Sequence, residues 1–151
     1  MPRVLPLLAE TGPDGVAMKA HMSQPRTQYG FGFELPLRTQ TENNNNEHWR
    51  KRWQRAKLQR TTVCQYLWML YRAGYRIQLP ALVTLIRVAP RQLDHIDNLS
   101  SAGKHIRDGI ADFFCLDDRT DQLAWHYAQM RGKPNYYGIR IVLEPQKENP
   151  I

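Results

Sequence analysis

The chain has 151 residues, of which 42% are hydrophobic, and it carries a formal net charge of +7. This length indicates one domain that buries a core without disulfides, and the basic balance indicates a polyanionic partner, most often nucleic acid. The cysteines, Cys64 and Cys115, have no CxxC or Cys/His spacing, so they give no indication of a zinc site and are expected to be buried free thiols in a reducing compartment.

Residues 1–28 contain four prolines and two glycines without a clear hydrophobic period, so we predict a flexible extension. It could be a functional arm or the remnant of an upstream start site. Its apolar patch is broken by Pro6, followed by Glu10, and too short for a signal peptide. No other segment approaches the length of a membrane span, so we expect a cytoplasmic protein with no membrane partner.

The next segment, "YGFGFELPL" (29–37), alternates apolar and other residues and predicts a strand that ends at a proline. A loop rich in asparagine follows. From Glu47 to about Arg72, apolar residues recur at spacings of three and four, which predicts a long helix. Trp49 and Trp53 fall on its apolar stripe, so we expect them in the core, although such rings could also stack on bases.

Beyond this helix, "LPALVTLIRVAP" (79–90) predicts a strand, and 97–114 predicts a second helix. We expect this helix to bury Leu99, Ala102, Ile106, Ile110 and Phe113. "QLAWHYAQM" and "YYGIRIVLE" predict two more strands, which the turn "RGKPN" would join into a hairpin.

The predicted order is therefore strand, long helix, strand, helix, strand, strand. It indicates a small α/β or α+β domain over residues 29–145, in which a mixed β-sheet packs against two main helices. Residues 146–151 would form a C-terminal tail.

The charges are distributed unevenly along the chain. No acid lies between Glu47 and Asp94, and the first predicted helix carries a dense group of cations: Arg50, Lys51, Arg52, Arg55, Lys57 and Arg60. These cations would repel one another in water, and an anionic partner would remove that cost and release counterions. The alternative is a solvated helix face, but such faces usually mix charges of both signs. We therefore interpret the helix as a nucleic-acid contact.

Half of the 14 acids follow within a short stretch: Asp94, Asp97, Asp108, Asp112, Asp117, Asp118 and Asp121. An acidic cluster would repel phosphates unless cations lay between them. A basic surface beside clustered carboxylates is thus typical of metal-assisted phosphodiester chemistry. The alternatives are ordinary ones, since Asp97 could cap its helix and Asp117–Asp118 could simply form a turn.

Asp97, Ser101, Lys104 and Asp108 are spaced four, three and four apart and share one face of the predicted helix. Lys104 could form an ion pair with Asp108, or it could lie near a scissile phosphate and neutralise developing charge. The neighbouring His105 is expected to be structural or exposed rather than a catalytic base.

The two acidic ends of this helix could meet in space. The helix would carry the chain back to the sheet, and the ends of two strands can lie close together in an α/β unit. Asp94 or Asp97 would then lie near Asp118, and one metal ion could bridge them.

Together, "DNL", a helix that contains "RDGIAD", and then "LDD" resemble the RusA-type Holliday-junction resolvases of phages and prophages. "FELP" in the first strand and the strand "LVTLIRVAP" support the resemblance, which covers roughly residues 29–145. It implies a homodimeric, Mg²⁺-dependent endonuclease, in a bacterial host, that cuts two symmetric strands of a four-way DNA junction in recombination and repair.

The resemblance implies a metal site made by a D-x-D-N-L motif and the second aspartate of a later D-D. Asp97 matches the second motif aspartate and Asp118 the later one. The first motif position falls on His95, with Asp94 one residue earlier, so either could fill it, although Mg²⁺ disfavours a histidine ligand. A family lysine four residues after the second motif aspartate is replaced by Ser101.

The resulting hypothesis assigns Mg²⁺ to Asp94, Asp97 and Asp118, with Lys104 stabilising charge in the transition state. The cations of the first helix would hold the junction arms, and hydrolysis would leave a 5′-phosphate. Two alternatives remain. One is a junction-binding protein of the same fold that has lost cleavage, and the other is a basic RNA-binding module.

Overall fold

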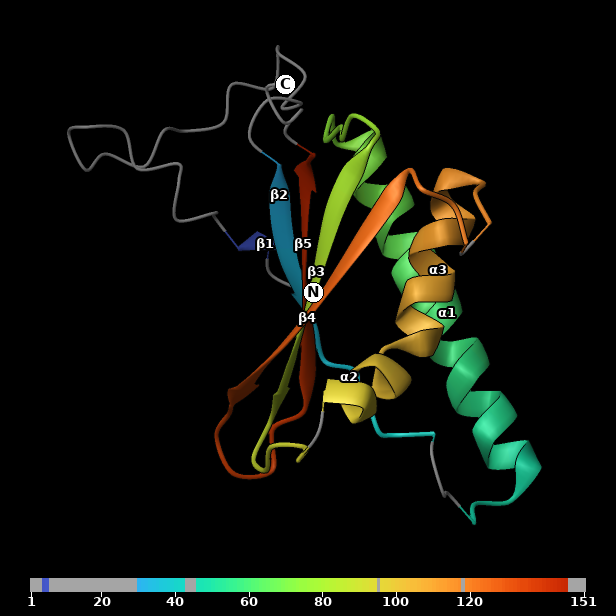
Figure 1. The fold of residues 1–151 in the computed structure, drawn as a ribbon, viewed down its shortest axis with the longest axis vertical. Coiled ribbons are helices and arrows are strands. Elements are labelled where there is room, and N and C mark those ends of the chain that lie inside the picture. Colours follow the sequence, from blue (N-terminus) through green and yellow to red (C-terminus); the bar gives the residue numbers. More distant parts are fainter. Residues whose placement is uncertain (1–3, 6–29, 43–45, 95, 118, 147–151) are drawn as a thin grey trace, which may run out of the picture.

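A computed structural model describes residues 4–5, 30–42, 46–94, 96–117 and 119–146. Its elements are β1 (Val4–Leu5), β2 (Phe31–Leu35), α1 (Trp49–Arg72), β3 (Ala81–Ala89), α2 (Ile96–Ala102), α3 (Lys104–Phe114), β4 (Leu123–Arg131) and β5 (Gly138–Pro145). The sheet has the order β1-β2-β5-β3-β4, with α1 and α3 on one side of it (Figure 1). The predicted mixed sheet with helices is confirmed.

The core forms where the sheet meets α1 and α3. Phe33 from β2 and Ile141 from β5 are fully buried, and they lie in one apolar cluster with Val63 and Leu67 of α1 and Ile110 of α3. Sequence periodicity places these side chains correctly, because the same repeat that forms each element also directs one face inward. Full burial of one such side chain contributes about 1.5–3 kcal/mol.

β4 and β5 do not form the predicted hairpin, which is therefore wrong. β3 lies between them: it pairs in parallel with β4, from Ala81 opposite Leu123 to Ala89 opposite Arg131, and it pairs antiparallel with β5. The two helices between β3 and β4 form the long crossover that parallel neighbours require. The turn after β4 therefore passes the end of β3, where the Gly132 N–H donates to the Ala89 carbonyl at 2.8 Å.

The second predicted helix is divided in two at Gly103. Gly103 is buried against the sheet, and a Cβ atom there would lie 3.2 Å from Leu85 Cδ1. The chain turns at this point, so α2 packs against β4 while α3 packs against α1. The contact between α3 and α1 is equally close, because a Cβ on Gly109 would lie 2.5 Å from the Arg60 carbonyl oxygen.

The prediction that Trp49 and Trp53 lie in the core is wrong, since they are 66% and 58% exposed. The buried residues of α1 begin only at Gln59, because the first turns of α1 project beyond the end of α3 (Figure 1). The apolar stripe of α1 extends over the whole helix, but no described element covers the part of it before Gln59.

The expectation of buried thiols is also wrong. Cys64 is half-buried and Cys115 is exposed. Cys115 is the residue that ends α3, in a left-handed conformation with φ of 55°.

Val4 and Leu5 pair with β2, so part of the predicted N-terminal extension belongs to the sheet. Residues 6–28 and 147–151 lie outside the described residues. Among the helices that the structure describes, none is both long and apolar enough to span a membrane.

Candidate functional site

The candidate site is the loop that leaves the carboxyl end of β3 and enters α2. Asp94 is exposed in this loop, and Asp97 is exposed in the first turn of α2. Because α2 begins at Ile96, Asp97 lies inside the helix and not at its N-cap position. A carboxylate in the first turn still interacts favourably with the helix dipole. His95, the other candidate for the first motif position, lies outside the described residues.

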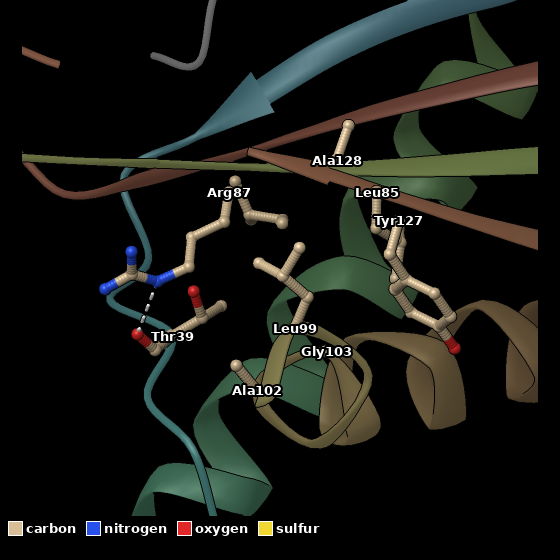
Figure 2. Close-up of a pocket in the computed structure, with 9 residues that line it drawn as sticks. Thr39, Leu85, Arg87, Leu99, Ala102, Gly103, Tyr127 and Ala128 are labelled. Atoms are coloured by element: carbon tan, nitrogen blue, oxygen red, sulfur yellow. Dashed lines mark hydrogen bonds between the residues drawn. The ribbon is translucent and has the colours of Figure 1, made fainter. Parts of the chain in front are cut away.

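Side chains of the sheet hold this loop in place. The Gln129 side chain of β4 accepts from the Leu93 N–H and donates to the Leu93 carbonyl, both at 2.9 Å. The Arg87 guanidinium of β3 donates to the Arg91 carbonyl at 2.8 Å and to the Thr39 carbonyl at 3.4 Å, and Figure 2 shows the second of these bonds. Burial lowers the pKa of Arg87. The acidic loop is thereby fixed to rigid strands.

A small cavity lies between the sheet and α2 beside Arg87 (Figure 2). It measures about 10 Å³, and its walls include Leu85, Leu99, Ala102 and Tyr127. Ligand pockets are typically some 300 Å³ or more, so this cavity is a packing defect under α2 and not a substrate site.

Two arginines lie where the acidic loop begins. An open hollow there is lined by Pro90, Arg91, Gln92 and Arg131. Both arginines are exposed, and Arg131 lies opposite Ala89 in the sheet, so it shares the carboxyl end of the strands with the loop. The loop that carries the exposed acids thus begins beside arginines suited to phosphate contacts.

Asp117, the described residue of the Asp117–Asp118 pair, lies at the other end of the sheet. Asp94 follows the end of β3, whereas Asp117 precedes the start of β4, and the two strands run parallel in register over nine residues each. Such a strand spans about 26 Å. Asp117 accepts from the Arg119 N–H at 3.0 Å in a turn there. Asp118 itself lies outside the described residues, so its expected contact with Asp94 or Asp97 is not described.

The reason for this separation is the direction of the crossover. In a parallel pair the carboxyl ends of the strands lie at one edge of the sheet and the amino ends at the opposite edge. Asp94 follows a strand, whereas Asp117 precedes one. α3 carries the chain back along the strands to their amino ends (Figure 1). The predicted return to the sheet is therefore correct, but the edge differs from the one expected.

Asp94 and Asp97 supply the carboxylate oxygens that a divalent cation prefers. Mg²⁺ commonly takes one or two protein carboxylates and completes its shell with waters and substrate phosphates. Neither aspartate forms an ion pair with another described residue. Within the described ranges, no three Asp, Glu, His or Cys side chains gather as a metal site. The two aspartates would thus be the ligands supplied by this loop.

Lys104 is exposed at the first residue of α3, directly after the Gly103 turn. The alternative ion pair with Asp108 does not form among the described residues. The Asp108 carboxylate instead lies 4.0 Å from Nδ1 of His105. Lys104 therefore remains available to an anionic substrate.

A polar cluster that sequence reasoning missed joins the 38–47 loop to α2 and α3. Its centre is Glu42, whose N–H donates to Ser101 Oγ at 2.9 Å and whose carboxylate accepts two bonds from Arg55 at 2.9 and 3.0 Å. His105 Nε2 lies 3.3 Å from the same carboxylate, and burial lowers the pKa of His105 although Glu42 and Asp108 oppose the shift. No local pattern marks Glu42, because its partners lie far along the chain.

This cluster gives Ser101 a structural contact. Its hydroxyl accepts from the Glu42 N–H and so holds the backbone of the 38–47 loop. Asn98 of the "DNL" motif also faces this loop, with its Oδ1 3.5 Å from Thr41 Oγ1. Both side chains contribute to docking of the loop.

The six cations of α1 are not equivalent. Arg52 and Arg55 are half-buried and form ion pairs with Glu42, and Arg55 also pairs with Glu47. Arg60 pairs with Asp112 of α3 at the surface. The helix itself contains no acid, but the fold brings acids to it from elsewhere. Arg50, Lys51 and Lys57 remain exposed without an ion pair to any other described residue.

No protein-family model matches the chain, and no curated protein or solved structure matches it either.

Proposed function

We propose that the protein is a Mg²⁺-dependent endonuclease that acts on four-way DNA junctions as a homodimer, in the manner of the RusA-type resolvases. The observation that carries this proposal is the loop at the carboxyl end of β3. It holds the exposed Asp94 and Asp97 on a backbone fixed by Gln129, beside the exposed Arg91 and Arg131.

Each group then has a defined part in phosphodiester hydrolysis. Asp94 and Asp97 would hold Mg²⁺, which when bound activates a water and polarises the phosphate. Arg91 and Arg131 would contact the neighbouring phosphates and orient the strand. Lys104 would offset the charge that develops on the phosphate in the transition state. Asp118 enters as a third ligand through the family resemblance alone.

The exposed cations of α1 would hold the junction arms. Arg50, Lys51 and Lys57 can contact phosphates directly, whereas Arg52 and Arg55 are committed to Glu42. Removal of one exposed cation should weaken DNA binding for all sequences and reduce its salt dependence.

The test is cleavage of a labelled four-way junction with Mg²⁺ and with EDTA. Paired symmetric nicks that require Mg²⁺, with linear duplex left intact, are the expected result. Asp97→Asn and Asp94→Asn should each abolish the nicks while junction binding persists. Asp121→Asn, an exposed acid near the start of β4, is the matched control and should cut normally. Unchanged cleavage in both loop variants would contradict the proposal.

The second candidate is junction binding without cleavage. Two observations favour it: Asp117 lies at the opposite end of β3 and β4 from Asp94, and Ser101 binds the Glu42 backbone in place of the family lysine. Tight binding of the junction without nicks, in Mg²⁺ and also in Mn²⁺, would select this function. Stronger binding of RNA than of any DNA form would instead select a basic RNA-binding module.

A further inference from the structure

The first turns of α1 expose two tryptophans that take no part in the described core, although the Trp49 ring stacks on His48 with 5.8 Å between the ring centroids. Trp49 and Trp53 are 66% and 58% exposed, and they lie four residues apart, so both rings project from one side of the helix. A buried tryptophan removes about 150–250 Å² from water, so two exposed rings leave a large apolar area uncovered. Paired exposed aromatics of this kind mark binding surfaces.

Each ring carries its own cation. The Arg50 guanidinium lies 5.4 Å from the centroid of Trp49, and Lys57 Nζ lies 5.0 Å from the centroid of Trp53. At about 100° per residue, these four positions fall within about 100° of the helix circumference. We call Trp49, Arg50, Trp53 and Lys57 the tryptophan stripe. Neither cation of the stripe pairs with an acid among the described residues.

We propose that the tryptophan stripe binds unpaired bases of a nucleic-acid strand. Every base offers a flat face that stacks on an indole, while Arg50 and Lys57 are placed to contact the flanking phosphates. Bases within a duplex already stack on one another and cannot offer that face. The stripe is therefore selective for unpaired nucleotides over continuous double helix.

Charge decides between this occupant and a second copy of the chain. A two-fold contact through the stripe would place Arg50 and Lys57 of one copy against the same cations of the other. α1 contains no acid that could offset this repulsion. A polyanion removes the repulsion, so the stripe is complementary to a nucleic-acid strand. The inference rests on the proposed function only in taking nucleic acid as the partner, and it is independent of cleavage.

The test compares labelled oligothymidine of about ten nucleotides with a duplex of the same length, by fluorescence anisotropy. The Trp49→Ala/Trp53→Ala variant should bind oligothymidine at least about tenfold more weakly, with its affinity for the duplex changed about twofold or less. Leu58→Ala is the matched control, because Leu58 is 59% exposed on the same turns outside the stripe. Trp49→Phe/Trp53→Phe keeps aromatic faces and should recover part of the binding, which separates stacking from a folding defect.

Quenching of tryptophan fluorescence by oligothymidine in the unmodified protein supports the same conclusion. Equal binding of oligothymidine by the alanine variant and the unmodified protein would overturn the inference, and junction cleavage would then still test the proposed function separately. Concentration-dependent dimerisation lost in the alanine variant, or stripe-dependent binding to anionic lipid vesicles without binding to oligothymidine, would overturn it as well. Stripe-dependent binding of oligothymidine without junction cleavage would leave the inference standing and remove the nuclease function.

Discussion

The two halves of α1 are attached to the rest of the protein by different interactions. The C-terminal half buries Val63, Leu67 and Leu70 against the sheet. The N-terminal half buries no apolar side chain there. Its first turns are held through Arg52, which pairs with Glu42, and Arg55, which pairs with Glu42 and Glu47. One helix thus combines a part that folds the domain with a part whose apolar side chains stay available for binding.

The largest effect is expected in the apolar half. Leu67→Ala should lower the free energy of unfolding by about 2–5 kcal/mol, because Leu67 is only 1% exposed and the alanine would leave a cavity. Urea unfolding measures this change, and the slope of the transition should stay constant. A change as small as that of the control Leu58→Ala, about 0.5 kcal/mol or less, would show that packing does not hold this half.

A smaller effect is expected in the charged half. Arg55→Ala should cost about 1–3 kcal/mol, because it leaves the half-buried carboxylates of Glu42 and Glu47 without this partner. Hydrogen exchange should accelerate in the first turns of α1 more than near Leu67. Arg60→Ala is the control, since its pair with Asp112 is exposed and contributes about 0–1 kcal/mol. Uniform acceleration along the helix would contradict the distinction between its halves.

Glu42, which holds the N-terminal half of α1, also contacts His105 of α3. The stability of the protein should therefore respond to acid through His105. Burial lowers the folded-state pKa of His105 below its usual 6.5, so the unfolded chain takes up the proton first as the pH falls. This contribution to stability is complete above about pH 6.5 and is lost as the pH falls through the folded-state pKa. His105→Gln should therefore lose less stability than the unmodified protein on acidification, as measured by urea unfolding at a series of pH values. Parallel curves for His105→Gln and the unmodified protein would refute this assignment.

The smallest effect on stability is expected at the tryptophan stripe. Trp49→Ala/Trp53→Ala should change the free energy of unfolding by about 0.5 kcal/mol or less, because the rings support no described core contact. Thermal unfolding followed by circular dichroism measures this change. A loss comparable to that of Leu67→Ala would show that the rings pack in the folded protein.

Periodicity predicted the elements well because it reports which side of a helix or strand faces apolar surroundings. It identified β2, α1 and β3 and, in the second predicted helix, the buried positions Leu99, Ala102, Ile106 and Ile110. It could not predict what each stripe packs against, so Trp49 and Trp53 were assigned to a core that ends before them. The division of the second helix at Gly103 depends on the proximity of Leu85, which is 18 residues away in the chain.

Only the part of the site that depends on local sequence was predicted. The position of Asp94 and Asp97 after β3 follows from the local sequence. The position of Asp117 depends on the direction of the crossover between β3 and β4. The turn "RGKPN" predicted a hairpin of the last two strands, so the parallel pairing of β3 with β4 was not predicted. Glu42 gave no signal, since its role depends on Arg55 and His105 from other elements.

The clamp that Gln129 forms on Leu93 makes the acidic loop part of the sheet. A primary amide donates and accepts as a peptide group does, so the side chain reproduces one rung of a β-ladder beyond Ala89, where the backbone pairing of β3 and β4 ends. Gln129→Glu would keep the acceptor for the Leu93 N–H but remove the donor to its carbonyl. The position of the loop is therefore set by the register of β3 and β4, so a slip of one residue between these strands would displace Asp94 and Asp97 without altering either aspartate.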